Sequence, residues 1–437
     1  MVNEPNPAPL FPPLTHEAWE SMVRNSLKGK EMAFLGYTTA EGVEVPWRVD
    51  AEKGLRTEGL PERWPQRSGS AIWEAQIQQT FLTPDALMQG LVQGVEGVRI
   101  PELQQRAPGL HAMLEGVHLE MVAVHLDGFE ATGSLRSLVA LADGRSLSGS
   151  CTRDVMRPEV DGERLALHVE AWGVAMPAFQ TWGVDVAPWI DSGMTPVRAL
   201  AAAFAALDDA ADALVRHGVS LEEAVRRCTI RWGVDSDLLA EATILRAIRW
   251  LWARWLSDRG LPDVPVWVEA RTTSLRHVWA PAEDNLLRTT AGTWAAVVGG
   301  ADGVETLVHD HRQGHPAEHA RRCARNISHL LREESGLHRV WDPLQGSHQA
   351  AFLSWTWVER AWEGLLDWRT RGGWNAGCAN GDLHRELQES RAQQLRSPMF
   401  LPRDSQAAPR VVESARAREP WYLADALLAA RAASTPQ

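Results

Sequence analysis

Tyrosine, cysteine, basic charge and long apolar runs are all scarce in this chain. Its 437 residues include two tyrosines and four cysteines, and 56 acidic side chains outnumber 44 lysines and arginines to give a formal net charge of -12. This acidity argues against nucleic acid or an anionic membrane as a partner, because both select for basic surfaces. No apolar run reaches the roughly 18 residues of a membrane helix, and the N-terminus lacks a signal-peptide pattern. We expect a soluble, cytoplasmic protein.

The four cysteines stand far apart, at positions 151, 228, 323 and 378. None belongs to a Cys-x-x-Cys pair or to a Cys/His ligand spacing, so the sequence predicts no zinc site. Their scarcity fits a reducing compartment. Tryptophan, by contrast, occurs 21 times, and such large indole surfaces are usually buried in cores or interfaces.

From about residue 70 onward, segments with the pattern of strands alternate with segments that have helical periodicity. The clearest helical segment spans residues 236–256, where apolar side chains recur at steps of three and four. We predict eight strands, at residues 71–79, 97–100, 119–126, 165–172, 228–234, 264–270, 304–310 and 337–343. This alternation predicts an α/β fold of the (β/α)8 TIM barrel type. A doubly wound open sheet is the alternative, disfavoured because no glycine-rich turn follows the first strand.

Three regions are expected. Residues 1–40 form an extended arm, with five prolines in the first 14 residues, and then a helix that starts at Thr15 and stops at Gly29. This helix packs either on the chain's own barrel or on a partner. Residues 41–370 form the barrel. Residues 371–437 form a helical appendage, too short and irregular for a second α/β domain.

Polar residues at the predicted strand ends are the candidates for a site, because barrel chemistry lies at the carboxyl ends of strands. They are Arg271, Thr272, Thr273, Ser274, His309, Asp310, His311, His315, Asp342, Gln345, Ser347 and His348. Arg271 and Arg288 suit anion binding, although a salt bridge within the rim is the alternative. The His309/His311 pair could hold a metal or be a solvated loop. Asn285, Arg288, Thr289 and Thr290 together indicate the rim of a site. Trp172, Trp232 and Trp267 are expected to fill the barrel axis.

Five segments in order along the chain resemble the methylmalonyl-CoA mutase family, most closely the small (β) subunit of the heterodimeric bacterial enzyme. They read FPPLTHEAWESMVRNSLKGK, EATILRAIRWLWARW, EARTTS, EDNLLRTTAGTWAAVVGGADGVETL and HARRCARNISHLLREESGLHRVWDPLQGSHQAAFL. The resemblance implies a substrate-binding (β/α)8 barrel. In catalytic chains of the family, the acyl-CoA lies along the barrel axis and a separate domain carries adenosylcobalamin.

The chain departs from the catalytic pattern where chemistry is expected. QIQQTFLTPDALM replaces a Tyr-Ala-Gly-Phe-Ser segment, and APWIDSGMTPVRAL places Pro188 where the family has a histidine. Both tyrosines, Tyr37 and Tyr422, lie outside the barrel proper. The residues after the barrel are too few for a cobalamin-binding domain. We therefore expect Arg271, Asn285 and Arg288 to be a vestigial substrate-site rim, with no catalytic, cofactor-binding or metal residue in this chain.

The resemblance thus implies a non-catalytic small subunit that stabilises a methylmalonyl-CoA mutase large subunit in a heterodimer. Adenosylcobalamin would then belong to the partner chain. One alternative is an active acyl-CoA mutase barrel that works with a separate cobalamin-binding chain. Another is a barrel enzyme of different chemistry, with Arg271 or the His309/His311 loop as its site.

Overall fold

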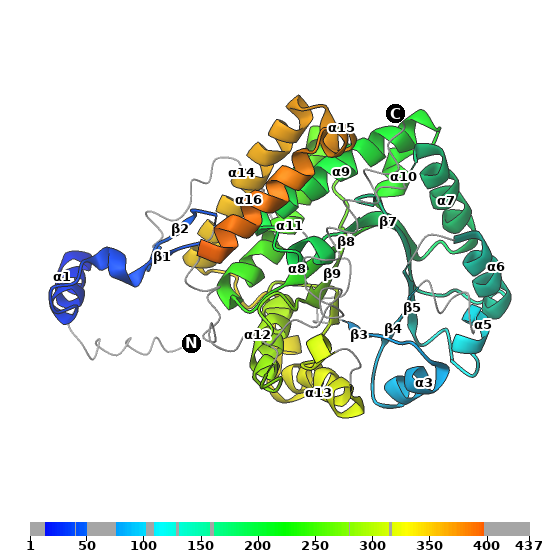
Figure 1. Cartoon of the computed structure of the whole chain (residues 1–437), viewed down its shortest axis with the longest axis horizontal. Coiled ribbons are helices and arrows are strands. Elements are labelled where there is room, and N and C mark those ends of the chain that lie inside the picture. Colours follow the sequence, from blue (N-terminus) through cyan, green and yellow to red (C-terminus); the bar gives the residue numbers. More distant parts are fainter. Residues whose placement is uncertain are drawn as a thin grey trace, which may run out of the picture.

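The computed structural model describes residues 14–39, 41–49, 76–101, 109–127, 131–157, 161–278, 280–313 and 317–396. Eight parallel strands close into a barrel with helices around its outside (Figure 1). The strands follow one another in chain order from β3 to β10, and β10 pairs with β3 to close the ring. The predicted (β/α)8 barrel is confirmed, and the doubly wound open sheet is wrong.

Six of the eight predicted strands overlap observed ones. The barrel strands are β3 (Gln76–Thr80), β4 (Gly97–Ile100), β5 (Ala123–Leu126), β6 (Gly149–Asp154), β7 (Phe179–Asp185), β8 (Cys228–Val234), β9 (Trp267–Thr272) and β10 (Gly303–Glu305). The start of the first predicted strand, residues 71–75, lies outside the described residues.

Two predicted strands are wrong, and two real strands went unpredicted. Residues 165–172 belong to helix α7 (Gly162–Ala175), whose buried side chains Leu165, Val169 and Trp172 recur at helical spacing. Residues 337–343 form a short 3-10 helix, η5 (Leu337–Arg339), and a loop. The unpredicted strands are β6 and β7, which carry polar or glycine residues on one face.

The helices surround the barrel in chain order. Those flanking the strands are α3 (Pro84–Val92), α5 (Leu110–Met113), α6 (Ala131–Ala142), α7, α8 (Ala187–Asp191), α9 (Pro196–Arg216), α10 (Leu221–Val225), α11 (Leu238–Asp258), α12 (Asp284–Val298), η3 (His311–Gln313), α13 (Glu318–His329) and η4 (Leu330–Glu334). After η5 come α14 (His348–Thr370), which packs on α9 and α11, then α15 (Gly373–Ala379) and α16 (Asp382–Arg396). Within the described residues, no helix has the length and apolarity to cross a membrane.

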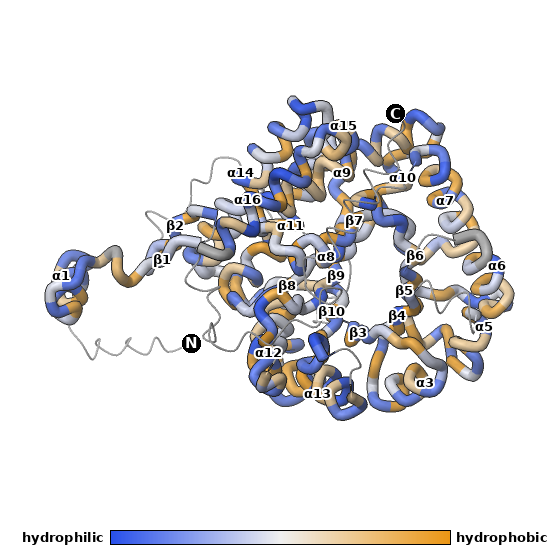
Figure 2. Tube along the Cα trace, viewed as in Figure 1, coloured by the Kyte–Doolittle hydropathy of each residue, from blue (hydrophilic) through white to orange (hydrophobic). Residues whose placement is uncertain are grey.

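The apolar core lies between the barrel strands and this helical ring. One cluster joins β7–β9 to α9, α11 and α14, and a second lies under α3, α5 and α7. Figure 2 shows hydrophilic and hydrophobic positions alternating along the barrel strands. Nine indoles are almost fully buried in the chain's own core, at positions 172, 182, 189, 232, 252, 255, 357, 368 and 374. These nine explain much of the tryptophan excess without a partner.

The N-terminal segment stands away from this body (Figure 1). Helix α1 (His16–Ser26) begins after Thr15, whose Oγ1 accepts a hydrogen bond from Ala18 N at 3.2 Å, as predicted. It is followed by η1 (Met32–Leu35) and by a hairpin of β1 (Tyr37–Thr38) and β2 (Glu44–Val45). The predicted proline arm (residues 1–13) and the end of the appendage (residues 397–437) lie outside the described residues.

Candidate functional site

The interior of the barrel is lined by polar and charged side chains. Alternate residues of a strand point to opposite faces, so one set faces the helices and the other faces the barrel axis. The outward set is mostly apolar, as with Val98, Ile230 and Val268, which are buried in the core. The buried polar set is Gln78, Arg99, His125, Ser150, Thr229, Arg231, Glu269 and Glu305.

Arg99 on β4 and Glu269 on β9 form an ion pair across the barrel, although 170 positions separate them in sequence. Both residues are 3% exposed. Arg99 also pairs with Asp127, which follows β5. His125 Nδ1 lies 3.3 Å from Glu269 Oε1 and 2.9 Å from Ser150 Oγ. These contacts tie four strands together at the axis.

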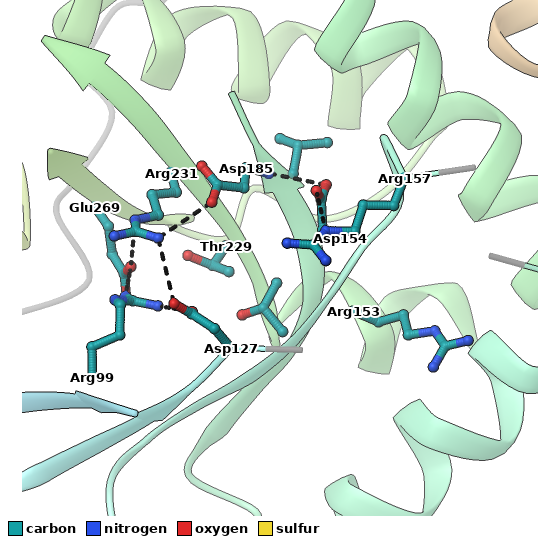
Figure 3. Close-up of a pocket in the computed structure, with 11 residues that line it drawn as sticks. Arg99, Asp127, Arg153, Asp154, Arg157, Asp185, Thr229, Arg231 and Glu269 are labelled. Carbon is teal, nitrogen blue, oxygen red and sulfur yellow. Dashed lines mark hydrogen bonds and ion pairs between the residues drawn. The ribbon is translucent and has the colours of Figure 1, made fainter. Parts of the chain in front are cut away.

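Arg231 on β8 is the second cation of this network. It pairs with Glu305 of β10, lies 3.2 Å from an Asp185 carboxylate oxygen at the end of β7, and lies 3.9 Å from Asp127. Thr80 Oγ1 donates to Glu305 Oε1 at 2.5 Å. Figure 3 shows Arg99, Asp127, Asp185, Arg231 and Glu269 converging from different strands. We call these five residues, together with His125 and Glu305, the axial network.

The arginines of the axial network lower the pKa of the buried carboxyl groups beside them. Burial would raise the pKa of the Glu269 carboxyl, but Arg99, His125 and Arg231 outweigh this effect and lower its pKa. The pKa of Asp127 and the pKa of Glu305 are lowered for the same reason. Burial, only partly offset by Glu269, lowers the pKa of His125 to about 4. At neutral pH the interior thus holds ionised carboxylates, two guanidinium groups and a neutral imidazole.

A cavity of about 70 Å³ remains beside the network, toward the carboxyl ends of β6–β8. Its lining includes Thr152, Asp154, Arg157, Asp185 and Thr229. Burial and the neighbouring Asp185 raise the pKa of Asp154 to about 6. Pockets for drug-sized ligands measure roughly 300–1,000 Å³, so this cavity has room for a few water molecules at most. Charged side chains from several strands meet at the axis beside this cavity.

The expectation that indoles fill the axis is wrong for two of the three tryptophans. Trp172 is on helix α7. Trp232 is on β8 but faces outward, where its Nε1 lies 3.4 Å from Glu241 Oε2 of α11. Trp267 has the inward parity of Glu269, at the amino end of β9. Charged side chains, rather than indoles, fill the barrel.

The predicted rim residues lie outside this network. Arg271, at the carboxyl end of β9, donates to Asp191 Oδ2 at 2.6 Å, the rim salt bridge considered above. Asn285 is fully buried, and its side chain bonds to the backbone of Val278 at 2.8 and 2.9 Å and to His309 O at 3.0 Å. Arg288 Nη1 lies 3.3 Å from Asn285 Oδ1. The structure therefore brings Asn285 and Arg288 together, in a role that fixes loops.

The remaining strand-end candidates take local structural roles. Thr272 Oγ1 accepts from Leu307 N at 2.7 Å, and Ser274 N donates to Asp191. Asp310 Oδ2 accepts from Ala317 N at 2.9 Å. Thr273 is buried. Gln345 and His348 are close in sequence to Ser347, the N-cap of α14. Asp342 pairs with Arg246 of α11, so this group flanks a helix start rather than a strand end.

The histidine loop forms no metal site in the part of the chain that is described. No three His, Cys, Asp or Glu side chains gather there with suitable geometry. His309 faces the ring of His319, with centroids 6.4 Å apart, and His311 begins η3. His315 lies outside the described residues.

The axial network itself was not predicted from the sequence. Its signal is nevertheless present, as a charged residue between apolar neighbours in VRI, VHL, IRW and VEA. A charge at an inward position of a buried strand requires a partner on another strand. A search confined to strand ends passes over such positions.

Comparison with known proteins adds the family context. Residues 157–398 match the methylmalonyl-CoA mutase family. The chain is 29% identical over 410 residues to a methylmalonyl-CoA mutase small subunit of Streptomyces virginiae, covering 85% of this chain and 66% of that protein. It is 26% identical to the small subunit of Porphyromonas gingivalis, covering 87% and 67% of the two chains. A probable small subunit of Mycobacterium bovis is 35% identical over 202 residues, covering 44% and 32%. The chain thus spans about two thirds of the length of the first two relatives.

Proposed function

Because this chain belongs to the methylmalonyl-CoA mutase family, we propose that it is a non-catalytic small subunit. In this proposal it binds and stabilises a catalytic large subunit in a heterodimer, and the large subunit carries adenosylcobalamin. The observation that carries the proposal is the axial network, which occupies the axis of the barrel with paired charges.

The filled axis supports a role without substrate. A thioester of coenzyme A is a long, flexible molecule, and the cavity of about 70 Å³ beside the network is far smaller than an ordinary ligand pocket. Moving one axial side chain aside would leave its partner as a buried, uncompensated charge. Substrate would therefore have to displace several ion pairs at once.

The positions of particular residues support the same reading. Tyr37 is on β1 of the N-terminal hairpin, and no tyrosine occurs between it and Tyr422. Pro188 is in the first turn of α8, immediately beyond the carboxyl end of β7. The position of Pro188 therefore offers no imidazole, and no tyrosine of the barrel offers a phenol, for proton transfer to a ligand on the axis. The imidazole that lies at the axis, that of His125, contacts Glu269 and Ser150.

The histidine loop does not fit a cobalamin ligand. Asp310 and His311 are adjacent, and Asp310 Oδ2 already accepts the backbone hydrogen bond from Ala317. Within the described residues, no second α/β module stands beside the barrel. We assign no step to the cofactor in this chain.

Helix α1 supplies a surface for the proposed partner. No residue of this helix is buried, and Met22 is 60% exposed. Phe34, in the following η1, is 63% exposed. An amphipathic helix held away from its own domain gains stability when its apolar face is covered. The small and large subunit names of the relatives make a large subunit the partner to test.

Co-expression with a methylmalonyl-CoA mutase large subunit tests this proposal. We expect a stable one-to-one complex, no turnover of methylmalonyl-CoA by the isolated chain, and no binding of methylmalonyl-CoA to it by calorimetry. Met22→Glu should weaken the complex at least tenfold without loss of fold, whereas Asn25→Glu, at an exposed polar position of α1, should leave affinity unchanged. Turnover after addition of adenosylcobalamin and a separate cobalamin-binding chain would instead favour the active-barrel alternative.

A further inference from the structure

The β1–β2 hairpin lies across the starts of three barrel helices. Glu41, at its turn, accepts a hydrogen bond from Val197 N of α9 at 2.6 Å. Pro46 O, just after β2, accepts from Gln349 Nε2 in the first turn of α14 at 2.9 Å. Burial, together with the nearby carboxylate of Asp237, the N-cap of α11, raises the pKa of Tyr37 of β1 to about 12. These helix starts lie around the carboxyl end of the barrel.

Glu41 satisfies a helix end that its own N-cap leaves open. Thr195 precedes α9, but its side chain makes no capping hydrogen bond. The first backbone N–H groups of a helix have no partner within it and favour a nearby carboxylate. Val43 and Val45 of the hairpin are 3% and 4% exposed, and Val43 joins the main core. The hairpin is thus held on the barrel by polar contacts at α9 and α14 and by the buried side chain of Val43.

The other end of the hairpin holds α1. The rings of Trp19 and Trp47 stack with centroids 5.2 Å apart, and the Arg48 guanidinium lies 4.4 Å from the Trp19 ring centroid. His16 Nδ1 is 3.5 Å from Arg48 Nη1. Helix α1 is therefore connected to the barrel through a short element whose two ends both make specific contacts.

We propose that Glu41 is a positioning residue for subunit assembly: its bond to the start of α9 fixes the β1–β2 hairpin and, through it, the direction in which α1 leaves the barrel. The consequence for assembly rests on the function proposed above. The role in fixing the hairpin does not, because it concerns the isolated chain. A partner meeting an already oriented helix loses less conformational entropy on binding.

The charges around Glu41 make the docked hairpin sensitive to pH. Burial raises the pKa of Glu41 to about 7, although the bond from Val197, the Thr195 hydroxyl, Arg198 of α9 and Arg360 of α14 oppose this rise. Arg198 is itself paired with Glu389 of α16 at 2.8 Å. The undocked carboxyl would return to its ordinary pKa of 4.5. A group whose pKa is raised on docking favours docking when protonated, so docking weakens as pH rises through 7.

Hydrogen exchange of the hairpin in the full isolated chain tests the role of Glu41. From pKa values of 7 and 4.5, the opening equilibrium of wild type should rise about tenfold between pH 6 and pH 8, after correction for intrinsic exchange. Glu41→Gln keeps an acceptor but cannot ionise, so its opening should be independent of pH. Glu41→Ala, which also cannot ionise, should open the hairpin about 5- to 30-fold more often than Glu41→Gln at both pH values. Glu44→Gln, an exposed position of β2, is the matched control and should behave as wild type.

The outcomes separate this proposal from the function proposed above. Equal wild-type opening at pH 6 and pH 8, or Glu41→Ala protection equal to that of Glu41→Gln, would overturn the role of Glu41 whether or not a partner binds. A Glu41→Ala chain with an open hairpin should bind the large subunit more weakly, and unchanged affinity would overturn the assembly role. A wild-type chain that binds no large subunit would refute the heterodimer, while hydrogen exchange would still decide what Glu41 does.

Discussion

Replacing Glu269 by glutamine should expose how strongly the axial network is coupled. The side chain is 3% exposed, pairs with Arg99, and lies 3.3 Å from His125 Nδ1 and 4.0 Å from Arg231. Glutamine has nearly the same shape, so the change removes charge without creating a cavity. It takes one carboxylate from Arg99, which keeps Asp127, and from Arg231, which keeps Asp185 and Glu305. Breaking a buried pair typically costs about 3–5 kcal/mol, and the remaining carboxylates place the expected loss toward the lower end of that range. A pair 4 Å apart at an effective dielectric constant of 20 gives a similar Coulomb energy, about 4 kcal/mol.

Urea unfolding, followed by both tryptophan fluorescence and ellipticity, measures this loss. The control is Glu222→Gln, since Glu222 pairs with Arg226 at 3.5 Å but both side chains are about half exposed, at 59% and 49%. That exposed pair should contribute less than about 0.5 kcal/mol. A loss below about 1 kcal/mol for Glu269→Gln, or one no larger than the control, would refute the view that these charges are desolvated and mutually dependent.

Three further outcomes are expected. His125 has a pKa lowered to about 4 in the fold, so the native state disfavours its protonation. The free energy of unfolding of wild type, measured by urea titration, should therefore fall by up to about 3 kcal/mol as pH falls from 6.5 to 4. The fall should be smaller for His125→Gln. Gly183 cannot carry a side chain, because a Cβ there would lie 1.9 Å from Thr229 O. Gly183→Ala should therefore yield no folded barrel by circular dichroism. The control Gly218→Ala, which has open space around it, should cost only about 1 kcal/mol of stability. Burial raises the thiol pKa of Cys151 and Cys228. Iodoacetamide should therefore label the folded chain at positions 323 and 378 alone. Labelling of all four cysteines in the folded chain at neutral pH would contradict the burial of Cys151 and Cys228.

The helical periodicity of the sequence predicted most of the fold. Helix α11 spans Leu238–Asp258, and its apolar positions follow the predicted face. The failure at residues 165–172 arose because a short apolar run fits a buried strand and a buried helix equally well. Strand β6 has the sequence GSCTRD. Its inward residues are polar and its outward residues include one apolar side chain, Cys151, so the sequence does not show the hydrophobic pattern of a strand.

The site was harder to predict than the fold, for a physical reason. Strand ends can be identified from local sequence, but the partners of an inward charge depend on the closure of the whole barrel. Arg99 and Glu269 meet only because β4 and β9 lie across a ring from each other. Asn285 shows the opposite case, since its polar neighbourhood was visible in sequence while its bonds to Val278 and His309 were not.

The axial network also explains why a barrel of this family, once filled in this way, would not easily reopen. Removing Arg99 alone leaves Glu269 and Asp127 short of a cation, and removing Glu269 alone takes from Arg99 and Arg231 one of the carboxylates that they face. Each single step therefore destabilises the fold before any channel forms. Replacing the pair together by apolar side chains of similar volume can be neutral or stabilising, yet such a change keeps the axis blocked. A channel would require small residues at several inner positions at once, with the loss of packing that this entails. On this argument, stability alone keeps the axial network in place, without any selection acting on chemistry.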